Sequence, residues 1–172
     1  MRRSVWFSVL VVFFLGFSTF SNAASLQSAK APFSEAKSEF SLLVRSGHNK
    51  RELSLAEIES LKHYEITMNA PGGVNGKFSG VLLADLIKYL KFDPSKRLYL
   101  RAVDDYKITL QPQKELGFDQ ILFVTRLDGH VISLINKGPF KIIWAHNANE
   151  VESGLASSVK WIWSIVEIRE IP

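Results

Sequence analysis

Six residues whose side chains bind anions or small polar ligands stand near the expected turns of this sequence. Two flank one expected hairpin, two stand at the ends of a second, and two follow a buried apolar strand where the rim of a pocket would lie. Guanidinium, ammonium and phenol groups bind anions through charge-assisted hydrogen bonds. The alternative is that these groups form scattered salt bridges and turn contacts. We predict one pocket for a small anion or a partner's loop, lined by Arg101, Tyr106, Arg126, Lys137, His146 and Asn147.

Several kinds of catalysis have no residues to support them. The chain contains no cysteine, which excludes thiolate nucleophiles, thiolate metal ligands and disulfide bonds. The four histidines lack metal-ligand spacing, and no Gly-x-Ser-x-Gly segment marks a serine nucleophile. The glycine-rich segment 72–76 lacks the lysine of a phosphate-binding loop. We therefore predict no catalytic residue and no metal site. Trp144, Trp161 and Trp163 are interpreted as core residues, with a stacking cage as the alternative.

The segment 119–147 is expected to form the centre of the fold. Apolar runs at 120–127 and 130–135 flank Asp128-Gly129, a strong hairpin signal, and a third run covers 140–145. All three are too apolar throughout for a sheet with one wet face. They predict buried strands, over which the remaining elements pack.

The other segments predict short strands and two short helices. Ser54 and Glu57 form a capping box that starts a helix, and the glycines of 69–78 indicate a flexible loop. The remaining expectations are strands at 39–45, 63–68, 97–103, 106–110 and 160–171, helices at 55–61 and 81–90, a helical turn at 112–116, and a loop or turn at 150–158. The predicted fold class is α+β, with a mixed or antiparallel β-rich core.

The first residues have the pattern of a secretory signal peptide. Arg2 and Arg3 precede an apolar run, Val5–Phe20, that is short for a membrane span, and small residues follow it. We predict a signal peptide over 1–23, a disordered leader over 24–37 and a single domain over 38–172. Removing 23 of 172 residues leaves 149 and lowers the net charge from +4 to +2, so a nucleic-acid partner is not expected. The predicted location is the periplasm or the exterior, without a stable membrane span.

The order of several short motifs resembles the sulfite-oxidase-type molybdopterin-binding domain of oxidoreductases. Segment 77–86 is similar to its F-x-G-x-x-L-x-D-L/V-L motif, and 101–106 is similar to R-A-x-x-x-Y. Segments 126–129 and 137–143 match R-x-D-G and K-G-P-x-x-I/L-V/I. Segment 161–169 resembles the W-x-W and L-E-V/I-R ending of the family's short exported branch. The resemblance covers about 53–169 and implies the family's fold.

The same resemblance implies a lost activity. Family enzymes hold molybdenum through a cysteine placed between an early strand and the F-x-G helix, and the corresponding interval here, 67–76, has none. Hard oxygen ligands do not replace a soft thiolate. Loaded family enzymes are exported folded by the twin-arginine route, whereas this signal favours general secretion of an unfolded chain. We therefore expect no bound cofactor, with molybdopterin as the alternative.

These observations favour a non-catalytic periplasmic binding or accessory domain on a molybdopterin-binding-like fold. Its ligand would be a small anion or the periplasmic segment of a membrane sensor or signalling protein. One alternative is a molybdopterin-dependent oxidoreductase subunit. The other is a purely structural interaction module whose exposed aromatic residues pack on a partner.

Overall fold

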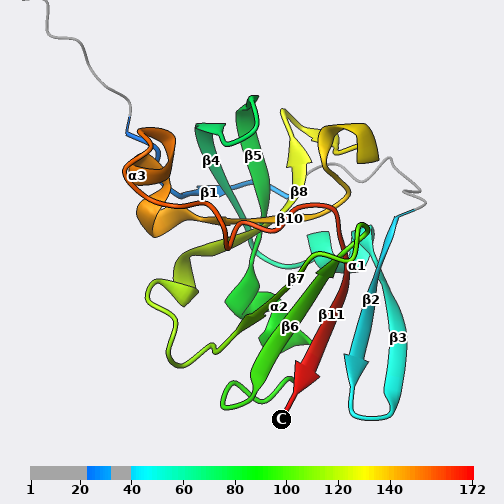
Figure 1. Ribbon diagram of the computed structural model, residues 1–172. Helices are drawn as coiled ribbons and strands as arrows, with labels where there is room; N and C mark the ends of the chain where they lie inside the picture. Colours follow the sequence, from blue (N-terminus) through cyan, green and yellow to red (C-terminus); the bar gives the residue numbers. More distant parts are fainter. Residues whose placement is uncertain (1–22, 32–39) are drawn as a thin grey trace, which may run out of the picture.

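The chain folds into two β-sheets joined by short helices, as the computed structural model of residues 23–31 and 40–172 shows (Figure 1). The first sheet has the order β1-β4-β5-β8-β10, with β9 also paired to β8. Its neighbouring strands are all antiparallel. Its strands are β1 (Gln27–Ala29), β4 (His63–Ala70), β5 (Val74–Leu82), β8 (Ile121–Leu127), β9 (His130–Val131) and β10 (Lys141–Trp144).

The central strand of the second sheet is β11, the last strand in the sequence. The sheet has the order β3-β2-β11-β6-β7, and β11 runs parallel to β2 but antiparallel to β6. The sheet is therefore mixed, with strands far apart in sequence side by side. Its strands are β2 (Ser41–Ser46), β3 (Asn49–Ser54), β6 (Arg97–Ala102), β7 (Lys107–Leu110) and β11 (Ile165–Ile171).

The helices are short, and α1 (Leu55–Glu59) begins as its sequence predicts. The Ser54 hydroxyl accepts a hydrogen bond from the Glu57 backbone N–H at 3.2 Å, and the Glu57 carboxylate accepts the Ser54 N–H at 2.8 Å. The helix α2 (Leu83–Tyr89) buries Leu83, Leu86 and Ile87. The remaining turns are α3 (Ala148–Glu152) and the 3-10 turns η1 (Phe118–Gln120), η2 (Leu134–Asn136) and η3 (Ala145–Asn147).

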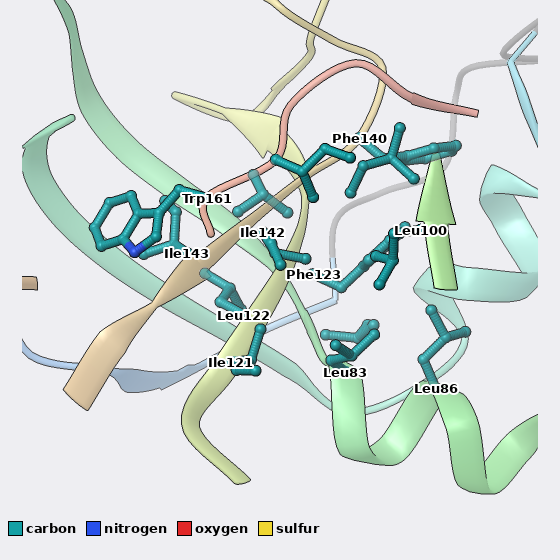
Figure 2. Close-up of a cluster of buried hydrophobic side chains, with 14 of the residues drawn as sticks. Leu83, Leu86, Leu100, Ile121, Leu122, Phe123, Phe140, Ile142, Ile143 and Trp161 are labelled. Carbon is teal, nitrogen blue, oxygen red and sulfur yellow. The ribbon is translucent and has the colours of Figure 1, made fainter. Parts of the chain in front are cut away.

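The two sheets and α2 share one apolar core. Figure 2 shows Leu83 and Leu86 of α2 close to Leu100 of β6 and Phe123 of β8. The rings of Phe123 and Phe140 lie 5.4 Å apart, and every residue from Ile121 to Arg126 is buried. The prediction that β8 and β10 form the buried centre is confirmed. Clusters of this kind supply most of the stability of a domain without disulfide bonds.

Some predicted elements are wrong or shifted. Segment 69–78 is not a loop, because Gly72 and Gly73 adopt positive φ angles in a tight turn that joins β4 to β5. Part of the predicted leader forms β1, which pairs with β4, while residues 32–37 lie outside the described residues. The strand β3 was not predicted. The run 130–135 keeps only two strand residues, and β11 begins five residues later than predicted.

Two glycines permit close backbone contact. At Gly80 of β5, a Cβ atom would collide with the carbonyl oxygen of Phe123 and lie 2.9 Å from Val124 Cα. The register of β5 against β8 shifts at this point, between Ser79 and Gly80. At Gly138 a Cβ atom would collide with the backbone of Ile132. Glycine inside a strand commonly marks such an approach.

The segment predicted as a signal peptide lies outside the described residues, apart from Ala23. Within the ranges that the structure covers, no helix combines the length and apolar character required to cross a bilayer.

Candidate functional site

In the described structure, the six residues predicted to line one pocket lie at several separate places. Arg101 and Tyr106 belong to the β6–β7 hairpin, and Arg126 lies on β8. Lys137 precedes β10, whereas His146 and Asn147 form part of the turn that follows it. The predicted convergence of all six is therefore wrong, and each group has to be considered by itself.

Arg126 forms a buried ion pair with Glu59. Its Nε and Nη2 atoms donate to the two carboxylate oxygens of Glu59 at 2.7 and 2.8 Å, and Nη1 donates to the Gly129 carbonyl at 3.1 Å. The Thr125 hydroxyl donates to the same carboxylate at 2.8 Å. Both charged side chains are more than nine-tenths buried. The Arg126 guanidinium thus connects α1 to β8, and each of its three nitrogens donates a hydrogen bond within the protein.

Arg101 also pairs with a carboxylate. Its Nε donates to Glu167 at 3.0 Å, and Arg45 and Arg169 approach the same buried carboxylate from β2 and β11. Burial raises the pKa of Glu167, but hydrogen bonds from Arg169 and Arg101 outweigh it and hold that pKa below its usual value. The hydrogen bond to Glu167 raises the pKa of Arg101. This cluster holds three strands of the second sheet together.

Lys137 contributes to a small basic depression that we call the lysine hollow. Two lysines and two tryptophans meet there at the tip of the β4–β5 hairpin, and Lys137 Nζ lies 4.0 Å from the centre of the Trp163 ring. Lys137 has a φ of 63°, which turns the chain from η2 toward β10. The hollow has a volume of about 20 Å³ and is lined by Ala70, Pro71, Val74, Lys137, Lys141, Ile142, Ile143, Trp161 and Trp163.

Lys141 is the unusual residue of the lysine hollow. Its exposed fraction is 6%, and no carboxylate in the described part of the chain pairs with its ammonium group. Its Nζ atom lies 5.2 Å from the centre of the Phe78 ring. Burial, together with the charge of Lys137, lowers the pKa of Lys141 to about 8. Sequence reasoning missed this residue, although a lysine inside an otherwise apolar run was a readable signal.

His146 and Asn147 line a larger space that we call the indole cavity. Its volume is about 270 Å³. The Trp144 and His146 rings meet edge to face with their centres 5.8 Å apart. Tyr106 fixes one wall, because its hydroxyl donates to the Val159 carbonyl at 2.9 Å. The cavity is lined by Glu115, Leu116, Trp144, His146, Asn147, Ser157, Val159, Lys160 and Trp161.

The lysine hollow and the indole cavity flank the same strand. Lys141 opens β10, Trp144 ends it, and Trp161 lines both spaces. Figure 2 shows Trp161 beside Ile143. Trp144 and Trp161 are buried, as predicted for core residues, with exposed fractions of 4% and 6%. The candidate site is therefore organised along β10 rather than around the hairpin ends.

The fold is distantly similar to that of a dehydrogenase of known structure. No protein-family model matches this chain, and no curated protein matches its sequence. Among solved structures, the chain is similar to the sulfane dehydrogenase SoxCD from Paracoccus pantotrophus, with a TM-score of 0.54 and 10% identity. The match covers 78% of this chain and 39% of that chain, so this chain spans less than half of its length. At this identity the similarity supports a distant relationship of fold.

The residues near the β4–β5 hairpin do not fit a molybdopterin bound through a thiolate. The hairpin occupies the interval where the resemblance would place the cysteine, and its donors there are oxygen and nitrogen atoms and the Met68 thioether. Such a set of donor atoms does not replace a soft thiolate as a ligand for molybdenum. The space that Thr67, Met68, Asn69 and Gly76 line has a volume of about 340 Å³, and its wall carries Glu65 and Glu152 but no thiolate.

Proposed function

We propose that this chain is a non-catalytic periplasmic binding domain that holds a small anion in the lysine hollow. What supports the proposal is a buried ammonium, that of Lys141, with a second lysine beside it and no carboxylate partner among the described residues. A buried charge is costly unless it is paired, so an anion between the two lysines would relieve both desolvation and repulsion. The size of the hollow favours chloride or one oxygen of an oxyanion.

The Trp163 ring and the hairpin tip would complete such a site. The indole of Trp163 holds Lys137 in place by a cation–π contact, and Gly72 leaves room for the Lys137 ammonium because a Cβ atom there would collide with it. A preorganised cation reduces the entropy lost when an anion binds. The proposal thus assigns Lys137 the role that the sequence predicted and adds Lys141.

We expect chloride to stabilise the protein through Lys141. At constant ionic strength and pH 7, replacing gluconate by chloride should raise the Tm of the wild type, because chloride binds only the folded state. Lys141→Met should abolish this response. Without chloride, the variant should unfold with a free energy about 2 kcal/mol higher than the wild type, since a buried ammonium is removed. Thermal and urea unfolding followed by circular dichroism measure both effects.

The pH dependence supplies a second readout. Because the pKa of Lys141 is lowered to about 8 in the folded protein, the unfolded state binds more protons between that value and 10.5. The wild type should therefore gain stability relative to Lys141→Met as the pH rises through this window, while its chloride response fades. Lys107→Met, at an exposed lysine of β7, is the matched control and should keep the response. A chloride response that survives in Lys141→Met contradicts the proposal.

We also propose that the protein works without molybdopterin, because the β4–β5 hairpin offers no thiolate. Protein purified from its native periplasm should contain far less than one molybdenum atom per chain by elemental analysis. Oxidised extracts should lack pterin fluorescence. A stoichiometric, dialysis-resistant molybdenum content would instead favour an oxidoreductase subunit.

A further inference from the structure

A groove of about 450 Å³ lies between α2 and the segment that leads into η1. Its volume is typical of sites that hold small organic molecules, which measure about 300–1,000 Å³. It has no lining residue in common with the lysine hollow or the indole cavity. Most of its lining side chains are apolar, and none of them is acidic. We call it the α2 groove, and it is lined by Ala84, Ile87, Lys88, Lys91, Phe92, Pro94, Pro112, Gln113 and Phe118.

Hydrogen bonds of the backbone fix both walls of the α2 groove. Where α2 ends, the Phe92 N–H donates to the Ile87 carbonyl at 3.0 Å, which turns the chain back over the last turn of the helix. In the other wall, the Phe118 N–H donates to the Glu115 carbonyl at 3.2 Å where η1 begins. Pro112 has a fixed φ angle, so it stiffens the same wall. The groove is therefore preformed, which lowers the entropic cost of binding.

Two exposed lysines, Lys88 and Lys91, give the rim of the α2 groove its charge. Lys91 has a φ of 56° at the position after the helix end where glycine is usual. Neither lysine forms an ion pair within the described part of the chain, and Asp85, one turn before Lys88, does not line the groove. Lysine stems cover apolar surface while their ammonium groups remain in water. The groove thus combines an apolar floor with a positively charged rim.

We infer that the α2 groove binds the anion of a single-chain amphiphile, such as a medium-chain fatty acid. Ile87, Phe92 and Phe118 form an apolar floor on which an alkyl chain would be removed from water. The carboxylate would accept charge-assisted hydrogen bonds from the ammonium groups of Lys88 and Lys91. An inorganic anion would leave the apolar floor uncovered, and a neutral lipid would leave both lysines unpaired. This inference does not rest on the lysine hollow, because no residue lines both spaces.

The test is isothermal titration calorimetry of the full chain with decanoate, kept below its critical micelle concentration at pH 7. Decanoate should bind saturably, with one site per chain. Two probes with the same alkyl chain but another head group, 1-decanol and decyltrimethylammonium, should bind at least tenfold more weakly, because neither carries a negative charge. Octanoate, which is two methylene groups shorter, should bind at least fivefold more weakly, because it buries less apolar surface.

Variants connect the binding to the α2 groove. Ala84→Phe should abolish the binding of decanoate, because Ala84 is half-buried in the lining and a phenyl group there would occupy the groove. Lys88→Gln/Lys91→Gly should weaken decanoate at least tenfold and leave 1-decanol unchanged, and glycine readily adopts the φ of position 91. Lys50→Gln, at an exposed lysine of β3, is the matched control and should leave both affinities unchanged.

A further probe and a further variant separate the other outcomes. An acidic peptide, acetyl-Asp-Leu-Glu-Leu-amide, should bind more weakly than decanoate, and tighter binding would assign the groove to a protein segment instead. Lys141→Met should leave the decanoate affinity unchanged, so a failure of this site is distinguishable from a failure of the chloride site. A lack of saturable heat with decanoate, equally tight binding of decyltrimethylammonium, or wild-type affinity in Ala84→Phe would overturn the inference.

Discussion

Replacing Arg126 by leucine is expected to lower the free energy of unfolding by about 3–5 kcal/mol. The substitution leaves the Glu59 carboxylate buried, with the Thr125 hydroxyl as its remaining side-chain partner. An unpaired charge in the core is far more costly than the pair, whose net contribution is small. Urea unfolding of the wild type and the variant, followed by circular dichroism, measures the difference.

Two comparisons make the Arg126 prediction specific. The double variant Glu59→Leu/Arg126→Leu should recover most of the loss, because both charges leave the core together. Arg101→Leu should cost only about 1 kcal/mol, since Arg101 is partly exposed and Glu167 keeps Arg45 and Arg169. If Arg126→Leu costs no more than Arg101→Leu, the buried pair does not hold α1 to β8.

Replacing Gly80 by alanine is expected to lower the free energy of unfolding by about 3 kcal/mol. The new Cβ atom would collide with the carbonyl oxygen of Phe123. Backbone atoms in the middle of a paired strand cannot move aside as a flexible side chain does, so β5 and β8 would have to separate. Because β8 is buried from Ile121 to Arg126 and lies inside the first sheet, the loss should affect the whole domain.

Gly129→Ala is the matched control for Gly80→Ala. Gly129 lies in the β8–β9 turn with a φ of 81°, and no atom lies within 4 Å of the Cβ position. Its substitution introduces only the strain of a left-handed conformation, about 1 kcal/mol. The same urea unfolding measures both variants. Equal losses of unfolding free energy would contradict the prediction, because they would show that the strands accommodate a Cβ atom at position 80 without extra cost.

The parts of the fold that were predictable depend on neighbouring residues. The capping box of Ser54 and Glu57 starts α1, and Asp128-Gly129 turns β8 into β9, because the decisive contacts lie within a few positions. The glycines and the proline of segment 69–78 indicate a loop, because these residues usually break regular elements. In the structure Gly72 and Gly73 form only a tight turn, and β5 pairs with β4 and β8, partners that the local sequence does not reveal.

The candidate site was less predictable because its decisive contacts are non-local. Arg126 is separated from Glu59 by 67 positions, so the sequence could not indicate that its guanidinium was already paired. His146 and Asn147 do line a cavity, but its other wall comes from residues 115–116 and 157–161. Lys141 was hidden for a different reason. Lys141 belongs to a strand whose other residues are apolar, and the apolar pattern indicates a buried strand without indicating a role for its one lysine.

The position of β11 between β2 and β6 imposes an order on folding. The β2–β3 and β6–β7 hairpins can form locally, but they remain two separate ribbons until Ile165–Ile171 enters between them. A ribosome releases these residues after nearly all others of this sequence. The edges of β2 and β6 therefore remain unpaired during synthesis, a state that favours aggregation unless a chaperone shields them.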